Sequence, residues 1–264
     1  MTTGMFRFTD HPPLVFAVSF VLLWLWARAG WSFLRGRWFL EEEARQTFGY
    51  VLGASLTLLG LIIGFSFSMA TTRYDQRKNY EEDEANAIGT EYLRADLLPA
   101  AEGAKARALL TNYLDLRIQF YLAQDGPDLQ RINDSTARLQ AEMWSAVRAP
   151  AAAQPTPVMA LAVSGMNDVL NSQGYTQAAW WNRIPPAAWG LMGAMGFVCN
   201  FLVGYGARGV KAGGKLLPVL PLVLAIAFML IADIDAPRHG IIRLKPLNLM
   251  SLAESLAVPP NHGM

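Results

Sequence analysis

The feature that most constrains this chain is a run of 26 residues, 47–72, that contains no charged side chain. An α-helix rises about 1.5 Å per residue, so about 20 apolar residues cross the hydrocarbon layer of a bilayer. The run is therefore long enough to span a membrane with some tilt. A dense belt of charges, residues 73–84, follows it directly. The sequence predicts a membrane helix that ends at this charge belt.

Three further segments have the same character. Residues 14–27 are apolar and rich in aromatic side chains, and this helix can extend to Leu34 if Arg28 snorkels toward the interface. Residues 184–207 carry no charge, and residues 216–232 form a third uncharged, apolar stretch. These runs predict an all-α integral membrane protein with four transmembrane helices.

The first apolar segment has an alternative interpretation as a cleavable secretion signal. Arg7, the apolar stretch and the small residues around Arg28 imitate the three parts of such a signal. Trp24 and Trp26 are too bulky for the positions just before a cleavage site, which favour small residues. We therefore expect the segment to remain as a membrane helix.

Composition and motifs narrow the function classes. The net charge of +1 argues against a nucleic-acid partner, because binding phosphates requires a basic excess. The single cysteine, Cys199, rules out a disulfide within the chain, and His11, His239 and His262 are too scattered for a metal site. The sequence contains no phosphate-binding loop and no nucleophile motif. We expect no enzymatic activity, no metal and no cofactor.

Residues 73–183 form a 111-residue segment that predicts a soluble helical insertion between the second and third membrane helices. Apolar residues at helical spacing on both sides of Asp125-Gly126-Pro127 predict a helical hairpin. Residues 149–157 hold three prolines and are expected to form a linker, before an amphipathic stretch at 158–170. The expected domains are 1–72 (two membrane helices), 73–183 (insertion), 184–235 (two membrane helices) and 236–264 (C-terminal tail).

Two faces of the second membrane helix stand out at 100° per residue. One face carries small residues and predicts a seam where a neighbouring helix packs closely: Gly53, Thr57, Gly60, Gly64 and Ser68. A second stripe lies roughly 120° away: Leu58, Ile62, Phe65, Met69, Thr72 and Gln76. This stripe suits either a hydrophobic constriction in a pore or a face toward lipid.

The third and fourth membrane helices carry polar residues that need partners. Small residues share one side of the third helix with Asn200: Gly193, Gly196 and Gly204. Asn200 would lie near mid-membrane, where an interhelical hydrogen bond or a wet cavity has to satisfy it. The fourth helix ends at Asp233 and Asp235, and an alternating four-pass path brings these carboxylates to the same membrane face as Arg73 and Arg77. We expect an ion pair at the membrane edge.

Several sequence blocks resemble the bacterial bestrophin-like proteins. The blocks are Gly64-Phe65-Ser66-Phe67-Ser68, Arg73-Tyr74-Asp75-Gln76-Arg77, residues 83–90, residues 92–99 and residues 233–240. Their order and the four-helix layout extend the resemblance over nearly the whole chain. The more distant bestrophins are pentameric ion channels whose second membrane helix lines the pore and carries a neck of bulky apolar residues.

The resemblance implies where a pore would be lined. The implied neck residues are Ile62, Phe65 and Met69, with Phe67 as an alternative. The implied charges near the pore mouth are Arg73, Arg77, Lys78, Glu81 and Glu84. Basic rings would attract anions and acidic rings cations, and the animal channels favour anions such as chloride. The acidic calcium clasp of those channels is not evident here beyond Asp233 and Asp235.

The stripe on the second helix and the resemblance together favour a homo-oligomeric channel for small ions. The resemblance implies that it is pentameric and lies in the bacterial inner membrane. Lysines and arginines of the loops divide seven against eight and do not set the orientation. The resemblance implies that the long insertion and both termini are cytoplasmic. The alternative from another class is a non-conducting membrane scaffold or sensor whose helical insertion binds a partner.

Overall fold

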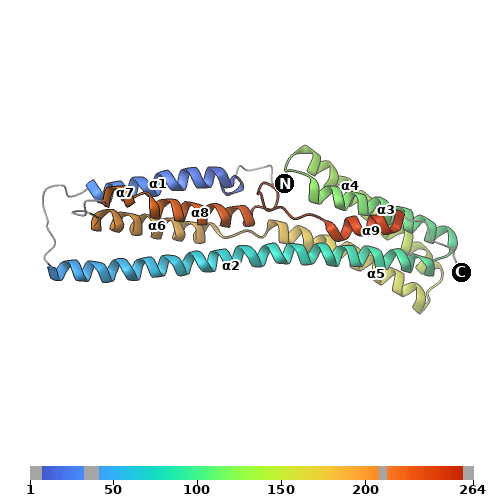
Figure 1. Ribbon diagram of the computed structural model, residues 1–264. Coiled ribbons are helices and arrows are strands. Elements are labelled where there is room, and N and C mark those ends of the chain that lie inside the picture. Colours follow the sequence, from blue (N-terminus) through green and yellow to red (C-terminus); the bar gives the residue numbers. More distant parts are fainter. Residues whose placement is uncertain (1–7, 33–41, 208–212, 258–264) are drawn as a thin grey trace. The chain divides into compact units, whose positions relative to one another are not determined.

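The computed structural model describes residues 8–32, 42–207 and 213–257, and these residues form helices without a strand (Figure 1). The described chain divides into two compact units. Of the described residues, 8–32, 42–73, 183–207 and 213–242 form the membrane unit, and 74–182 with 243–257 form the extramembrane unit. The extension of the first helix to Leu34 and the position of His262 lie outside the described residues.

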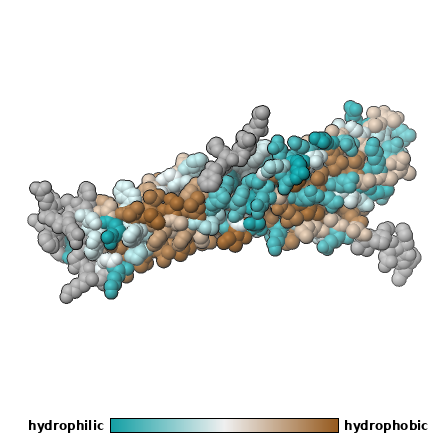
Figure 2. Space-filling model, turned by 90° about the horizontal axis from the view of Figure 1, so that it is seen from above, coloured by the Kyte–Doolittle hydropathy of each residue, from teal (hydrophilic) through white to brown (hydrophobic). Residues whose placement is uncertain are grey.

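The membrane unit confirms the prediction of four helices that are long and apolar enough to cross a bilayer. They are α1 (Pro12–Ser32), the first part of α2 (Glu42–Arg94), α6 (Pro186–Gly206) and α8 (Val219–Asp235), with a short α7 (Gly213–Leu216) and the 3-10 turn η1 (Phe8–Asp10). Prolines open α1 and α6, where a missing backbone N–H costs nothing. Hydrophobic residues dominate the surface of this unit in Figure 2.

Helices α1 and α6 cross at very short range through a reciprocal pair of glycines. A Cβ atom on Gly204 of α6 would lie 2.8 Å from the carbonyl carbon of Ala27, and one on Gly30 of α1 would lie 2.9 Å from that of Phe201. Both contacts are with backbone, which cannot rotate away. Small residues thus allow the two helices to pack by dispersion contacts, which drive association in lipid.

The extramembrane unit contains the second part of α2, η2 (Ala95–Leu97), α3 (Ala100–Leu122), α4 (Pro127–Ala153), α5 (Pro157–Trp181) and α9 (Leu247–Ala257). Helices α3 and α4 form the predicted hairpin, and Gly126 makes its turn with φ of 149°, which favours glycine. Thr156 caps α5 by accepting a hydrogen bond from the Met159 N–H at 3.2 Å. A buried core that includes Tyr113, Phe120, Met143 and Met166 joins the helices.

Two predicted boundaries are wrong. Helix α2 does not end at the charge belt but continues to Arg94, because Arg77, Glu81 and Glu84 are buried on one face of it and hydrogen-bonded there. Only residues 154–156 of the segment 149–157 form a linker, because α4 runs through Pro150 to Ala153 and α5 begins at Pro157. A proline inside a helix removes one hydrogen bond, and here the alanines around it and the burial of Pro150 offset that loss.

Candidate pore-lining helix

The membrane part of α2 has a packed face and a broad exposed face. Leu59 and Ala70 are buried in the core of the membrane unit, and Leu56, Ile62 and Ile63 pack against that core. Only 11% of the most apolar 18-residue stretch of α2 is buried, compared with 50% for the fourth crossing. The contacts of α2 within the described chain therefore cover one side of it.

The predicted neck residues divide between these faces. Phe65 is 65% exposed, Phe67 44% and Met69 39%, whereas Ile62 is half-buried against the membrane core. Phe65 and Phe67 are separated by about 200° around the helix, so they point to opposite sides. Phe65 and Met69 lie within about 40° of each other. Phe65 and Met69 are therefore the predicted neck residues that lie together on the exposed surface of α2.

The small-residue seam of α2 lies on the exposed side. Added Cβ atoms on Gly53, Gly60 and Gly64 would meet nothing within 4 Å, and Ser68 is exposed. Thr57 donates its hydroxyl hydrogen to the Gly53 carbonyl at 2.9 Å, which satisfies it within the helix. The described chain supplies no helix that packs on this seam, so close packing there remains a prediction about another copy.

The small residues of α6 lie partly in a helix contact and partly on an exposed surface. Gly196 packs against Leu23 and Gly204 against Ala27, whereas a Cβ on Gly193 would meet nothing within 4 Å. Asn200 is fully buried, and its side-chain N–H₂ donates to the Gly196 carbonyl of its own helix at 2.8 Å. Its Oδ1 has no hydrogen-bond partner among the described residues.

At the end of α8, Asp235 organises a cluster of arginines. Its carboxylate accepts a hydrogen bond from Arg183 Nε at 3.0 Å and from the Ile184 N–H at 3.2 Å, and Arg73 Nη1 lies 4.0 Å away. Arg183 also donates to Asp10 at 2.7 Å. Asp235 is 1% exposed, so these partners compensate its burial.

The carboxylate of Asp233 is hydrogen-bonded to backbone N–H groups. Its two carboxylate oxygens accept hydrogen bonds from the N–H groups of Ile241 at 2.6 Å and Ile242 at 2.9 Å. A Cβ on Gly240 would lie 2.6 Å from the Asp233 carbonyl oxygen, so the turn that follows α8 needs glycine at this position. Asp233 thus fixes a turn, and the arginine contact at this membrane edge is made by Asp235.

Most of the predicted mouth charges have partners within the extramembrane unit. Arg77 donates to the backbone carbonyls of Ala179 and Asn182, both at 3.2 Å. Glu81 accepts hydrogen bonds from the Leu249 N–H at 3.0 Å and the Asn248 side chain at 2.6 Å, at the N-terminus of α9. A carboxylate at a helix N-terminus compensates the unpaired N–H groups there. Lys78, by contrast, is exposed.

Glu84 belongs to a buried polar network between α2, α3 and α5. Arg117 of α3 donates to it through Nε, and the hydroxyls of Tyr121 and Thr176 donate to Oε2 at 3.1 and 3.2 Å. Glu84 and Arg117 are both 0% exposed. Burial, with the Glu84 carboxylate as a second cause, raises the pKa of Tyr121 above its ordinary value. The charge of Glu84 is therefore balanced inside the unit.

These buried charges could have been found from spacing. Arg77, Glu81, Glu84, Ile88 and Glu91 follow one another at steps of three or four residues, which is the pattern of one helix face. A search for apolar residues at helical spacing does not find this face, because four of its five residues are charged. In the sequence, Arg117 interrupts a run of apolar residues at helical spacing. In the structure it is buried in the core, and its guanidinium carbon lies 4.3 Å from the centre of the Phe120 ring.

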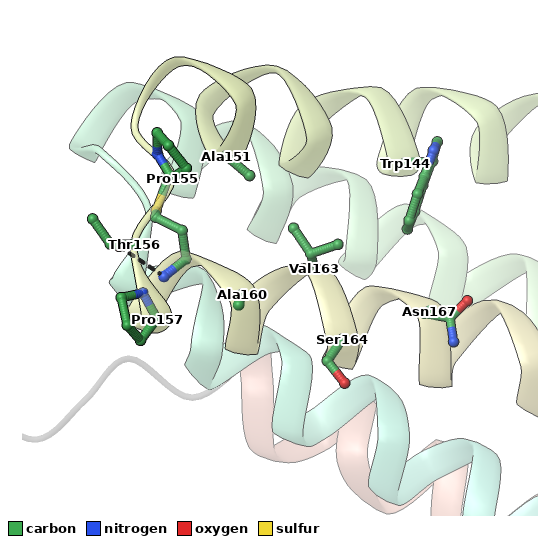
Figure 3. A pocket seen from close by; sticks show the side chains of 10 residues that line it. Trp144, Ala151, Pro155, Thr156, Pro157, Ala160, Val163, Ser164 and Asn167 are labelled. Carbon is green, nitrogen blue, oxygen red and sulfur yellow. Dashed lines mark hydrogen bonds between the residues drawn. The ribbon is translucent and has the colours of Figure 1, made fainter.

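The extramembrane unit also has an open depression of about 690 Å³ between α4 and α5. Figure 3 shows Trp144 and Val163 among the side chains that line it, with the Thr156 cap at one end. No charged residue lines this depression. Among the described residues there is also no group of three His, Cys, Asp or Glu side chains that could hold a metal ion. The depression does not carry the chemistry of a catalytic site.

Comparisons with known proteins agree with this geometry. The sequence model of the Bestrophin-like domain matches residues 15–249. Crystal structures of a bacterial bestrophin homologue from Klebsiella pneumoniae share the fold. One point variant has a TM-score of 0.65 at 12% identity, covering 96% of this chain and 99% of that one. A second has a TM-score of 0.63 at 14% identity, covering 91% and 97%. A comparison with curated proteins finds no match.

Proposed function

Because the chain belongs to the bestrophin-like family, we propose that it is an ion channel. Several copies, five in our proposal, form a closed ring in which α2 lines a central pore. The protein conducts small ions passively through the bacterial inner membrane, with the extramembrane unit and both termini in the cytoplasm. Chloride is the permeant ion that the family resemblance favours.

The observation that carries this proposal is the exposed face of α2. Phe65 is 65% exposed within the uncharged run 47–72. The adjoining seam of Gly53, Gly60 and Gly64 has no packing partner among the described residues. A glycine seam suits close approach of another helix better than contact with disordered lipid chains. In a cyclic ring, α2 of a second copy supplies that helix, and Phe65 and Met69 then face the axis.

A ring of this kind needs a hydrophobic neck that still passes ions. Bulky apolar side chains narrow a pore and gate it by excluding water. Phe65 and Met69 form such a neck in our proposal, and Phe67, which points away from them, contacts lipid or a neighbouring copy. Lys78 is the exposed cation among the predicted mouth charges. At 100° per residue it lies about 180° from Met69, on the side of Phe67, whereas the exposed carboxylate Asp83 lies on the side of Phe65.

Recording single channels from purified protein in a planar bilayer tests the proposal. We expect Phe65→Ala to raise the unitary conductance several-fold, because the shorter side chain widens and wets the neck. Leu191→Ala is the matched control, since Leu191 is an exposed apolar residue of α6, 51% exposed, and should leave conductance unchanged. Absence of conductance in every salt, or a purified particle of one or two copies, would contradict the channel and favour a membrane scaffold.

Reversal potentials measured in a potassium chloride gradient test whether chloride is the permeant ion. We expect the wild type to reverse toward the chloride equilibrium potential. We expect Asp83→Asn to raise the chloride-to-potassium permeability ratio, because it removes an exposed carboxylate on the Phe65 side of α2. Asp134→Asn, at an exposed residue of α4, is the control for loss of one negative charge. Reversal at the potassium potential in the wild type would overturn the choice of chloride and leave the pore itself in place.

A further inference from the structure

The buried carboxyl group of Glu91, in the extramembrane unit, has no hydrogen-bond partner among the described residues. Glu91 lies on α2, well beyond the uncharged membrane run 47–72, and is 0% exposed. Arg77, Glu81 and Glu84 on the same face all have hydrogen bonds, whereas neither carboxylate oxygen of Glu91 has a hydrogen-bond partner among the described residues. A buried, ionised carboxylate without partners is costly, so the environment of Glu91 favours the neutral acid.

Helix α5 encloses this carboxyl group from the other side. A Cβ atom on Gly165 would lie 2.5 Å from Arg94 Nη1 and closer still to Glu91 Oε2. The Glu91 carboxyl group therefore occupies the space that a side chain at position 165 would need. At 0% exposure, the Glu91 side chain has no contact with bulk solvent while α2 and α5 remain packed.

The charges that act on Glu91 are few. Arg94 lies one turn further along its own helix and favours ionisation, while Asp168 lies one turn beyond Gly165 on α5 and opposes it. From η2 and α3, the nearby charges Asp96 and Arg107 pair with each other. Helix α9 packs on this part of α2 through Leu252, which approaches Gly89, and its acidic residue Glu254 is exposed.

Burial, opposed in part by Arg94 and reinforced by Asp168, raises the pKa of Glu91 from 4.5 to about 8. The folded unit thus holds a proton between these two pH values that a hydrated carboxyl group would release. The contribution of Glu91 to the stability of the packed state is therefore greatest below about pH 4.5, falls as the pH rises to about 8, and is level above that value.

We propose that Glu91 is a proton-dependent latch between α2 and α5. The neutral carboxyl group packs against Gly165 and holds α5 in place. The ionised carboxylate requires water, and water reaches it when α5 separates locally from α2. The latch acts within the extramembrane unit, so it stands or falls independently of ion conduction.

Hydrogen–deuterium exchange of the full-length protein in lipid nanodiscs tests the latch. The readout is the protection of α5 amides around Gly165, corrected for the intrinsic pH dependence of exchange. If exchange requires the opening that hydrates Glu91, protection in the wild type falls about tenfold per pH unit between pH 6 and pH 8. In Glu91→Gln, which keeps the shape and removes the titration, protection should not change with pH.

Two further variants separate the latch from general effects of pH. Glu82→Gln removes an exposed carboxylate of the same helix and should keep the wild-type pH dependence. Asp168→Asn removes the charge that opposes ionisation of Glu91. The fall in protection should therefore end at a lower pH than in the wild type. This variant keeps the proposal testable if Glu91→Gln does not fold. Wild-type protection that is independent of pH, or an unshifted profile in Asp168→Asn, would overturn the latch.

Discussion

Replacing Arg117 with methionine is expected to lower the free energy of unfolding of the extramembrane unit by about 3–5 kcal/mol. The substitution keeps an unbranched, apolar stem of similar reach but leaves the Glu84 carboxylate buried at 0% exposure with only the hydroxyls of Tyr121 and Thr176 as donors. An unpaired buried charge costs far more than the net gain of the pair that compensated it. Denaturant unfolding, followed by far-UV circular dichroism in detergent, measures the loss.

Two controls distinguish an unpaired charge from the loss of any arginine. Arg131 pairs with Asp128 at the surface, where both side chains are more than 70% exposed, so Arg131→Met should cost less than about 1 kcal/mol. The double variant Glu84→Gln with Arg117→Met should recover much of the stability, because it no longer buries a charge. Equal losses for Arg117→Met and Arg131→Met would show that the buried pair does not stabilise the unit.

The membrane helices and the α3–α4 hairpin could be predicted because each has a local signal. Uncharged runs mark the four crossings, and Asp125-Gly126-Pro127 marks the turn. The continuation of α2 through residues 73–94 had no such signal in hydropathy, since its buried face is built from charges whose partners, Arg117 and the α9 N-terminus, lie far away in the sequence. Hydrogen bonds between residues far apart in the sequence stabilise that part of α2, and a scan for hydrophobic periodicity does not detect them.

The sequence also predicted part of the candidate pore-lining helix. Periodicity separated Phe65 and Met69 from the glycine seam, and the structure adds that Ile62 packs inward and Phe67 points to the opposite side. Asp233 and Asp235 look equivalent in the sequence, but one accepts two backbone N–H groups and the other holds the arginines. Glu91 had no sequence signal beyond its spacing, because its burial depends on Gly165, 74 residues further along the chain.

The second large effect is expected at the crossing of α1 and α6. In Gly204→Ala, the new methyl group would lie 2.8 Å from the Ala27 carbonyl carbon and nearer to its oxygen, both backbone atoms of α1. The helices must move apart, and the matching contact of Gly30 with Phe201 opens with them. Because dispersion contacts at short range hold such helices together, we expect a loss of about 1–3 kcal/mol or more, seen as a lower melting temperature in detergent.

Gly193 of the same helix provides the matched control. A Cβ atom there would meet nothing within 4 Å, and alanine favours a helix interior over glycine by up to about 1 kcal/mol. Gly193→Ala should therefore leave the melting temperature unchanged or raise it slightly, while Gly204→Ala lowers it. Equal melting temperatures for the two variants would mean that α1 and α6 do not touch at Gly204. A drop confined to Gly193→Ala would instead indicate that another copy packs on the exposed side of α6.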